Sequence, residues 1–294
     1  MTVQQILARA TNQLKSSSSS PSLDAEVLLA LVLKTYRTNL LINVEQRLSW
    51  LELWRFQGLI AKRNRGWPVA YLTGNKEFYG RNYKVTPKTL IPRPETELLV
   101  EKIIGIIRAQ RPVDPPPAGS LENGSIKTIA DIGTGSGCIA ITLALELPIV
   151  KIIATDISPN ALKVANLNAN LLGGKGRIDF RLGNLLEVLE NEKLDLVAAN
   201  LPYLTKEEYN ANPELKFEPK EALLEPIGLF DEFCRQIAKH NEIKFILLET
   251  SPRIINRWLA TLKKFYSTSA IFILPDLSGS SRLIIIDTNK ALKV

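Results

Sequence analysis

Hydrophobic residues near the start of the chain recur at the spacing of amphipathic helices. Ile6, Ala10 and Leu14 fall on one face of a first helix, and the pattern predicts two more helices over residues 22–33 and 49–63. Polar residues, glycine and proline separate the three segments. The beginning of the chain is therefore predicted to form a small helical domain.

A short stretch rich in aromatic residues and divided by Gly74 and Gly80 follows these helices. Its aromatic residues include Tyr71, Phe78, Tyr79 and Tyr83. Such a pattern is typical of a β-hairpin, which we expect over residues 69–85 as a link between two domains. The next helix is predicted from Pro94 to about residue 108, because proline and acidic residues at its start favour helix entry.

Strands and helices alternate in the remainder of the chain, after a Pro-rich loop expected over residues 110–125. The predicted strands cover residues 126–132, 151–157, 194–199, 243–248, 270–274 and 282–287, with another ending near 182, and the helices cover 137–147, 158–172 and 252–265. This alternation predicts a parallel sheet covered by helices. The last two strands have no helix between them, so we expect them to pair antiparallel.

Composition excludes several other classes of protein. The chain has 294 residues, of which 45% are hydrophobic and 23% charged, as in globular proteins. Cys138, Cys234 and the single histidine, His240, cannot form a disulfide scaffold or a four-ligand zinc site, so we expect no metal. Neither a signal-peptide core nor a membrane span is evident in the sequence. We therefore expect a cytoplasmic protein without membrane contact.

The positive charge of the chain is confined to its first part. The net charge is +7. Residues 1–125 contain 17 Lys and Arg against 10 Asp and Glu, whereas residues 126–294 contain 20 of each. A basic face favours a polyanionic partner or a nucleoprotein setting, and an ordinary solvated surface is the alternative interpretation.

The first chemical motif reads DIGTGSG over residues 131–137, at a predicted strand-to-helix turn. Glycines let the backbone approach a ligand closely, and a helix start offers free N–H groups. A dinucleotide fingerprint would place its last glycine at Cys138, so this spacing instead resembles the S-adenosylmethionine (SAM) site of methyltransferases, with a ligand-free tight turn as the alternative. The candidate cofactor residues of this turn are Asp131, Gly133, Thr134, Gly135, Ser136 and Gly137.

Two further positions are candidates for cofactor contacts. Asp156 ends the next predicted strand, where a carboxylate can accept hydrogen bonds from both ribose hydroxyls. Asn184, followed by Leu185, comes directly after the third strand, and its amide could recognise the edge of an adenine ring. A helix cap and a plain loop asparagine are the respective alternatives.

The motif with the most specific chemistry is Asn200, Leu201, Pro202 and Tyr203, which directly follows a buried strand. Ligands of open α/β sheets bind beyond the carboxyl ends of the strands, where this motif falls. The Asn200 side-chain oxygen and the Leu201 carbonyl can accept the two N–H bonds of an amide or amine, which orients the nitrogen and stabilises the positive charge that develops during methyl transfer. Pro202 would stiffen the turn, and Tyr203 offers a flat surface to a planar substrate.

In this order, the motifs resemble those of the peptide chain release factor glutamine N5-methyltransferases, a family of class I SAM-dependent methyltransferases. The resemblance covers nearly the whole chain. The other stretches that carry it are residues 68–74 (PVAYLTG), 78–80 (FYG), 90–97 (LIPRPETE), 217–223 (FEPKEAL) and 276–282 (DLSGSSR). Residues 92–95 (PRPE) would form either a cover over the cofactor pocket or a rigid entry to the following helix. The chain departs from the family pattern at Leu201, where the family usually has proline, and at Asn184, where it often has aspartate.

The resemblance implies a seven-stranded Rossmann-like α/β sheet with the last strand antiparallel. It implies a helical substrate-docking domain over residues 1–67, a hairpin linker over 68–88 and a methyltransferase domain over 89–294. SAM would be bound by the glycine turn, Asp156, Asn184, Leu185 and Asn200, and the glutamine amide would be held by the residues from Asn200 to Tyr203. The substrates would be release factors, methylated on the glutamine of their Gly-Gly-Gln loop by a monomer without direct contact to nucleic acid.

Three other functions are compatible with parts of the sequence. An N-methyltransferase for adenine or cytosine amines in RNA or DNA would use the same cofactor, and Asn-Leu-Pro-Tyr is also the form found in rRNA adenine N6-dimethyltransferases. A steep salt dependence of substrate binding would favour that alternative. A module that binds SAM or a translation factor without catalysis is disfavoured by the intact Asn200 motif, and an NAD-dependent oxidoreductase is disfavoured by the glycine spacing.

Overall fold

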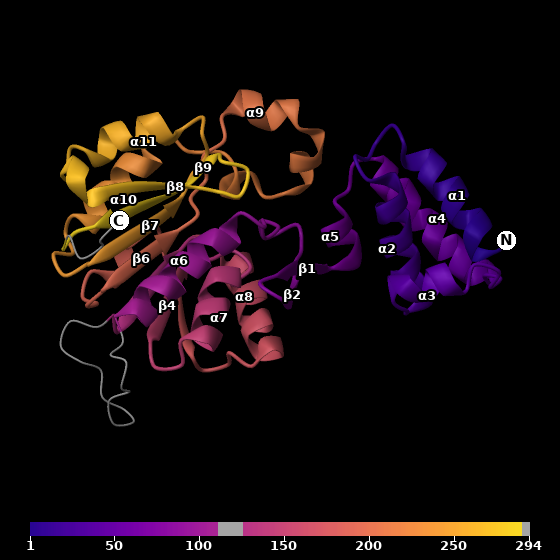
Figure 1. Ribbon diagram of the computed structural model, residues 1–294, viewed down its shortest axis with the longest axis horizontal. Helices are drawn as coiled ribbons and strands as arrows, with labels where there is room; N and C mark the ends of the chain where they lie inside the picture. Colours follow the sequence, from indigo (N-terminus) through magenta and orange to yellow (C-terminus); the bar gives the residue numbers. More distant parts are fainter. Residues whose placement is uncertain (111–125, 290–294) are drawn as a thin grey trace. The chain divides into compact units, whose positions relative to one another are not determined.

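The computed structural model of the protein describes residues 1–110 and 126–289 and divides into two units (Figure 1). The helical unit is formed by Met1–Asn75 and Asn210–Phe217, and the sheet unit by Lys76–Tyr209 and Glu218–Val294. The loop predicted over residues 110–125 lies outside the described residues, apart from its first residue. Nothing in the sequence pattern indicated that residues 210–217 join the helical unit.

The helices of the helical unit are α1 (Val3–Leu14), α2 (Pro21–Leu33), α3 (Arg37–Ile42), α4 (Trp50–Asn64), α5 (Val69–Thr73) and the 3-10 helix η2 (Pro213–Phe217). The unit is built on the amphipathic helices α1 and α4 and on α2, which is apolar on nearly all sides. Ile6 of α1, Leu28 of α2 and Phe56 of α4 belong to one buried cluster. Reciprocal capping boxes begin α1 at Thr2 and α4 at Ser49. The three helices predicted for this part of the chain are confirmed, and α3 was not predicted.

The hairpin is shorter than the sequence pattern indicated. Residues 69–73, which were expected to start it, form the helix α5 instead, and Gly74 ends that helix in the left-handed conformation with a φ of 70°. The two hairpin strands are β1 (Asn75–Phe78) and β2 (Arg81–Lys84). The aromatic residues of the segment were therefore a poor guide to strand bounds, because the Pro68 that precedes α5 and the glycine that follows it decide the local structure.

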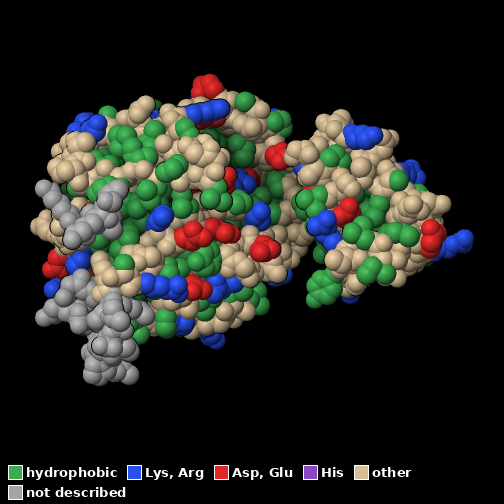
Figure 2. Space-filling view, in the orientation of Figure 1, with side chains coloured by type: hydrophobic (Ala, Val, Ile, Leu, Met, Phe, Trp, Pro, Cys, Tyr) green, Lys and Arg blue, Asp and Glu red, His purple; other side chains and the backbone are tan. Residues whose placement is uncertain are grey.

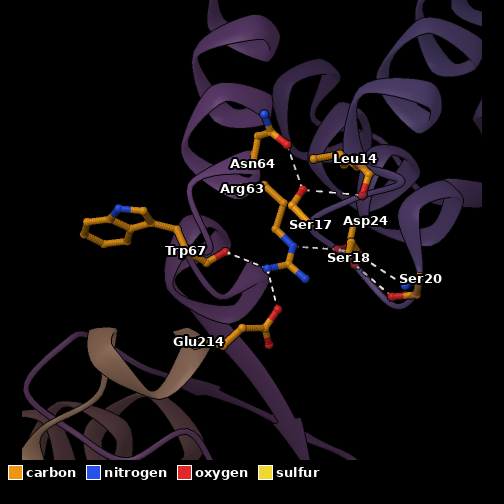
Figure 3. Close-up of polar contacts among 9 residues, drawn as sticks. All are labelled: Leu14, Ser17, Ser18, Ser20, Asp24, Arg63, Asn64, Trp67 and Glu214. Carbon is orange, nitrogen blue, oxygen red and sulfur yellow. Dashed lines mark hydrogen bonds and ion pairs between the residues drawn. The ribbon is translucent and has the colours of Figure 1, made fainter. Parts of the chain in front are cut away.

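The buried Arg63 side chain pairs with Asp24 and also with Glu214, one of the residues 210–217 of the helical unit (Figure 3). Arg63 on α4 is 5% exposed, and its guanidinium lies 2.6 Å from the carboxylate of Asp24 and 2.8 Å from that of Glu214. The Arg63 side chain also donates to the carbonyl of Trp67. The ring of Trp67 lies 4.8 Å from that of Phe217, centre to centre. An ion pair and an aromatic contact thus attach residues 210–217 to α4 and to the turn that follows α4.

Replacing Arg63 with alanine is expected to lower the free energy of unfolding of the helical unit by about 3 kcal/mol, because the Asp24 carboxylate is left buried without its counter-charge. The matched variant Glu214→Ala removes a carboxylate that is 55% exposed, and it is expected to cost less than about 1 kcal/mol. Urea unfolding followed by circular dichroism measures both. Equal losses in the two variants would contradict the assignment of Asp24 as the dominant partner.

The sheet unit contains a seven-stranded sheet in the order β5-β4-β3-β6-β7-β9-β8. Its strands are β3 (Thr128–Ile132), β4 (Lys151–Asp156), β5 (Ile178–Leu182), β6 (Leu196–Ala199), β7 (Phe245–Glu249), β8 (Ile271–Pro275) and β9 (Ser281–Asp287). The first five pair parallel, and β9 is antiparallel to both β7 and β8. The predicted strands and the antiparallel last strand are confirmed.

Helices cover both faces of this sheet (Figure 1). The helices of the unit are α6 (Thr96–Ala109), α7 (Cys138–Glu146), α8 (Pro159–Leu172), α9 (Lys206–Ala211), α10 (Leu229–Ile237) and α11 (Ile255–Leu262), with short 3-10 helices at Glu187–Leu189, Lys220–Ala222 and Thr268–Ala270; the last residues of α9 belong to the helical unit. One buried cluster joins α6, α7 and α8 to one face, and a second joins α10 and α11 to the other. Side chains from adjacent positions of a strand enter opposite clusters, as in a sheet buried on both sides.

Two helices of the second face differ from the sequence-based expectation. The helix predicted over residues 252–265 is shorter, Ile255–Leu262. The helix α10 was not predicted, although Phe230, Phe233 and Ile237 repeat at helical spacing and are buried. A crossover between parallel strands requires such an element, so the topology could have located it. No helix in residues 1–110 and 126–289 is both long and apolar enough to cross a membrane.

Candidate active site

The site lies where the strand order reverses direction. From β3 the chain proceeds outward to β4 and β5, whereas β6 and β7 lie on the other side of β3. Ile132 at the end of β3 pairs with Thr155 of β4 and with Ala199 of β6. Loops leaving neighbouring parallel strands on opposite sides of such a point open a crevice at the carboxyl edge of the sheet. The glycine turn and Asn200 directly follow β3 and β6, and Asp156 is the last residue of β4.

A cavity of about 320 Å³ occupies this crevice within the sheet unit. The predicted residues that line it are Gly133, Gly135, Asp156, Asn184, Leu185, Asn200, Leu201 and Pro202. The predicted residues Asp131, Thr134, Ser136, Gly137 and Tyr203 are not among its lining. The structure thus brings most of the candidate residues together around one cavity, and the other five do not line it.

A buried carboxyl group, that of Asp131, holds the glycine turn through hydrogen bonds. Asp131 is 0% exposed, and its Oδ2 accepts hydrogen bonds from the hydroxyl of Thr134 at 2.6 Å and from the N–H of Ala140 at 3.2 Å. Burial raises the pKa of Asp131 to about 7. Its Oδ1 has no hydrogen-bond partner among the described residues. Asp131 therefore shapes the turn and the start of α7 and carries one unsatisfied polar atom.

Gly137 is where the turn most strictly requires glycine. It begins α7 with a φ of 82°, and a Cβ there would lie 2.8 Å from Cδ1 of Ile141 and 3.1 Å from Cβ of Ala165. A side chain would therefore strain the backbone and also overlap the interface of α7 with α8. Close packing of the helix on its neighbours, more than contact with a ligand, explains the glycine at this position.

Asp156 is fastened to the glycine turn. Its Oδ2 accepts a hydrogen bond from the N–H of Gly135 at 2.8 Å, and its Oδ1 accepts one from the N–H of Ser158 at 2.8 Å. The hydroxyl of Ser158 accepts from the N–H of Ala161, so Ser158, and not Asp156, supplies the side-chain cap of α8. Burial raises the pKa of Asp156, partly offset by its backbone hydrogen bonds. The carboxylate thus borders the cavity in a fixed orientation.

Asn184 and Leu185 form the wall after β5. The Asn184 amide nitrogen donates to the carboxylate of Glu187 at 2.9 Å. Leu185 adopts a φ of 53°, which is unfavourable for a branched side chain, and its carbonyl accepts a hydrogen bond from the hydroxyl of Thr155. Strained backbone of this kind is common where a loop is shaped to hold a ligand.

The Asn200 motif closes the cavity from the β6 side. Asn200 and Pro202 border it, and Leu201 is buried in the cluster beneath α10 and α11. The amide nitrogen of Asn200 donates to the hydroxyl oxygen of Thr96 at 3.3 Å. Tyr203 packs against the same cluster as Leu201, and burial raises its pKa to about 12. Asn200 is therefore the one polar side chain of the motif that faces the cavity.

The cover of the cavity is formed by residues next to 92–95, the stretch for which the sequence left open a cover over the pocket or a rigid helix entry. Residues 88–90 line it, as do Pro219, Glu221 and Ala222. Glu218 joins these two stretches, because its buried carboxylate accepts from the N–H of Ile91 and pairs with Arg93. Leu90 and residues 219–222 belong to stretches that carry the family resemblance, but the sequence did not assign them to the pocket. Within the described residues, no group of His, Cys, Asp or Glu side chains is placed to hold a metal ion.

Solved structures of a catalytic domain share this architecture. The hMettl16 catalytic domain in complex with MAT2A 3′UTR hairpin 6 is 16% identical, with a TM-score of 0.52, and the match covers 77% of this chain and 82% of that one. The same domain with hairpin 1 gives a TM-score of 0.52 at 15% identity, over 90% of this chain and 93% of that one. The chain thus shares the fold of this catalytic domain.

Two sequence families match the two parts of the chain. Residues 5–74 match the PrmC N-terminal domain, and residues 119–226 match the methyltransferase small domain. The release factor glutamine methyltransferase of Koribacter versatilis is 33% identical, over 97% of this chain and 98% of its own length. That of Moorella thermoacetica is 40% identical over 76% of this chain and 75% of its own length. The chain belongs to the release factor glutamine methyltransferase family.

Some relatives carry more than this chain contains. A bifunctional methyltransferase of Rickettsia typhi is 36% identical over 81% of this chain, and the match covers 49% of its own length. The chain thus spans about half the length of that relative.

Gly137→Ala is expected to lower the free energy of unfolding of the sheet unit by about 2 to 3 kcal/mol, through positive φ and overlap with Ile141. The matched control is Gly105→Ala in α6, where a Cβ would meet no atom within 4 Å. That change is expected to stabilise the unit by about 0.5 to 1 kcal/mol, because alanine favours a helix interior. Urea unfolding compares the two, and a neutral Gly137→Ala would show that α7 can shift away from α8.

Proposed function

We propose that the chain transfers a methyl group from SAM to the side-chain amide nitrogen of the glutamine in the Gly-Gly-Gln motif of peptide chain release factors. Family membership supports this reaction. The observation that carries it is the position of Asn200, whose side chain borders the same cavity as Gly135 and Asp156. A cofactor bound across the carboxyl ends of β3 and β4 would then face a substrate amide held after β6.

The residues of the cavity fit SAM. A Cβ on Gly133 would meet no atom within 4 Å, so the turn is open toward a ligand at that point. The carboxylate of Asp156 can accept hydrogen bonds from ribose hydroxyls while its backbone partners hold it in place. The wall at Leu185 and Pro226 offers apolar surface to a purine ring. When bound, SAM supplies a methyl group on a positively charged sulfur, which keeps the electron pair of the broken bond.

Asn200 and Leu201 would prepare the substrate nitrogen. An amide nitrogen is a weak nucleophile because its lone pair is delocalised into the carbonyl. The side-chain oxygen of Asn200 and the backbone carbonyl of Leu201 can each accept one of its N–H bonds, which fixes the direction of the lone pair. The same two oxygens stabilise the positive charge that the nitrogen gains when the new bond forms, and the loss of one proton then restores a neutral amide.

The proposal also covers the partners, oligomeric state and location of the enzyme. The enzyme acts on a protein substrate as a monomer in the cytoplasm, without membrane contact and without direct contact to nucleic acid. The excess positive charge of the first 125 residues would face acidic surface of the release factor. An N-methyltransferase for RNA or DNA amines is the competing function, because its substrates present the same N–H pair to Asn200.

Asn200→Ala is expected to reduce methyl transfer to a cognate release factor by at least about a hundredfold, because an oriented acceptor of developing charge is lost. Binding of SAM should change by less than about threefold, since the glycine turn and Asp156 remain. The matched variant Asp156→Ala should instead act mainly on the cofactor, and it is expected to weaken SAM binding. Peptide mass spectrometry of the Gly-Gly-Gln segment and calorimetry with SAM measure the two effects.

Three results would contradict the proposal. Methyl transfer to ribosomal RNA in a parallel reaction, without any on the release factor, would place the protein among the nucleic-acid methyltransferases. Binding of SAM with no transfer to either substrate would indicate a module without catalysis. Loss of SAM binding in Asn200→Ala would show that Asn200 chiefly serves the cofactor or the fold.

Leu201→Pro is expected to leave methyl transfer within about threefold of the natural chain, because the proposed role uses the backbone carbonyl, which proline retains. Leu201 is 3% exposed and packs beneath α10 and α11, so the smaller side chain should lower the free energy of unfolding by about 1 to 2 kcal/mol. Initial rates and urea unfolding measure these two quantities. An inactive but folded variant would show that the local backbone differs from that of relatives with proline.

A further inference from the structure

A buried glutamate lies beside Asn200 and has no role in the proposed chemistry. Ala199 of β6 pairs with Leu248 of β7, so the next residues, Asn200 and Glu249, are neighbours at the carboxyl edge of the sheet. Glu249 is 2% exposed, and its Oε2 has no hydrogen-bond partner within the described part of the chain. A buried carboxyl group with an unsatisfied oxygen destabilises a fold, so its presence requires an explanation.

Thr96 connects the two side chains. It is the first residue of α6 and is 2% exposed. Its hydroxyl oxygen accepts from the amide nitrogen of Asn200 at 3.3 Å. The Thr96 side chain also lies beside the carboxyl group of Glu249 and lowers its pKa. The backbone N–H of Thr96 donates to the carbonyl of Arg93, which fixes the position of the residue at the start of the helix.

The Thr96 hydroxyl has one hydrogen, and the chemistry of the three groups determines where that hydrogen points. A carboxylate only accepts, so the single hydrogen of the Thr96 hydroxyl points to Glu249. The hydroxyl oxygen then accepts from Asn200, which it can do only from the amide nitrogen. The opposite orientation of the Asn200 amide would set its oxygen against another acceptor. The ionised form of Glu249 therefore keeps the Asn200 oxygen free to face the substrate.

We propose that Thr96 and Glu249 are positioning residues of the methyl transfer and that their hydrogen-bond relay sets which end of the Asn200 amide faces the substrate. The inference deepens the proposed function and depends on it for its kinetic readout. Neither residue touches the substrate nitrogen in this arrangement. Their effect is on the fraction of enzyme in which Asn200 presents an acceptor.

Protonation of Glu249 would weaken this control. A neutral carboxyl group can donate to Thr96, and the hydroxyl can then donate to the Asn200 oxygen, so both amide orientations become possible. Burial is the main cause that raises the pKa of Glu249, to about 7, and Glu95 raises it further, whereas Thr96, Arg282 and Arg93 lower it. Tyr203 faces the same group. The relay is therefore complete above this pKa and is lost as the pH falls through it.

The kinetic test uses variants of Thr96 in the full chain. Thr96→Val removes the hydroxyl at similar size, and it is expected to reduce kcat by about tenfold or more while the Kd for SAM stays within twofold. Thr96→Ser restores the hydroxyl and should recover most of the rate. Thr261→Val on α11, which also removes a buried hydroxyl, is the matched control and should retain the natural rate. In an Asn200→Ala background, Thr96→Val should cause no further decrease in kcat.

The pH test uses Glu249→Gln. In the natural chain, kcat should fall on the acid side with a midpoint near the pKa of Glu249, and in Glu249→Gln this step should disappear. A second readout needs no substrate: the side-chain NH₂ signals of Asn200 in a ¹⁵N spectrum, assigned with Asn200→Ala, should shift with the same midpoint in the natural chain and not in Glu249→Gln.

The outcomes separate this inference from the proposed function. Absence of methyl transfer by the natural chain would defeat the proposed function, and the Asn200 signals would still test the relay. A natural rate in Thr96→Val, or an equal further loss in the Asn200→Ala background, would overturn the inference. Asn200 signals that titrate identically in Glu249→Gln would overturn it as well.

Discussion

The parallel register of β3 with β4 and β6 is the constraint on which the rest of the site depends. It brings the ends of three strands to one edge and makes the chain leave them on two sides of β3. The glycine turn, Asp156 and Asn200 then meet around one cavity, although 69 positions separate Asn200 from Asp131. No substitution in the pocket could compensate for a different register. A shift of one residue would turn the strand-end side chains to the opposite face of the sheet.

Burial of carboxyl groups at that edge links stability to chemistry. Asp131 and Glu249 are both almost fully buried, both have a pKa raised to about 7, and each retains an oxygen without a partner among the described residues. Asp131 holds the turn on the cofactor side, and Glu249 lies behind Asn200 on the substrate side. Such groups oppose folding, so the surrounding strands and helices must contribute enough apolar burial to hold them in place.

The two units share more than a linker. The chain passes between them at Asn75, again at Asn210 and again after Phe217. The second passage follows the Asn200 motif, and the third leads directly into the stretch from Pro219 to Ala222 that covers the cavity. Arg63 and Trp67 hold residues 210–217 within the helical unit (Figure 3). Charged side chains of both signs lie among hydrophobic ones on the face seen in Figure 2.

The sequence alone determined the alternation of strands and helices, the antiparallel last strand and the motifs at the strand ends, because these depend on local periodicity and on residues close together in the chain. It did not locate α5 or α10, the membership of residues 210–217, or the cover formed by residues 88–90 and Glu221. Nor did it distinguish Gly133, which faces the cavity, from Gly137, which faces Ile141 and Ala165. The tertiary structure decided these features, because each depends on contacts between segments that are distant in sequence, and the relay from Glu249 to Asn200 through Thr96 depends on three of them.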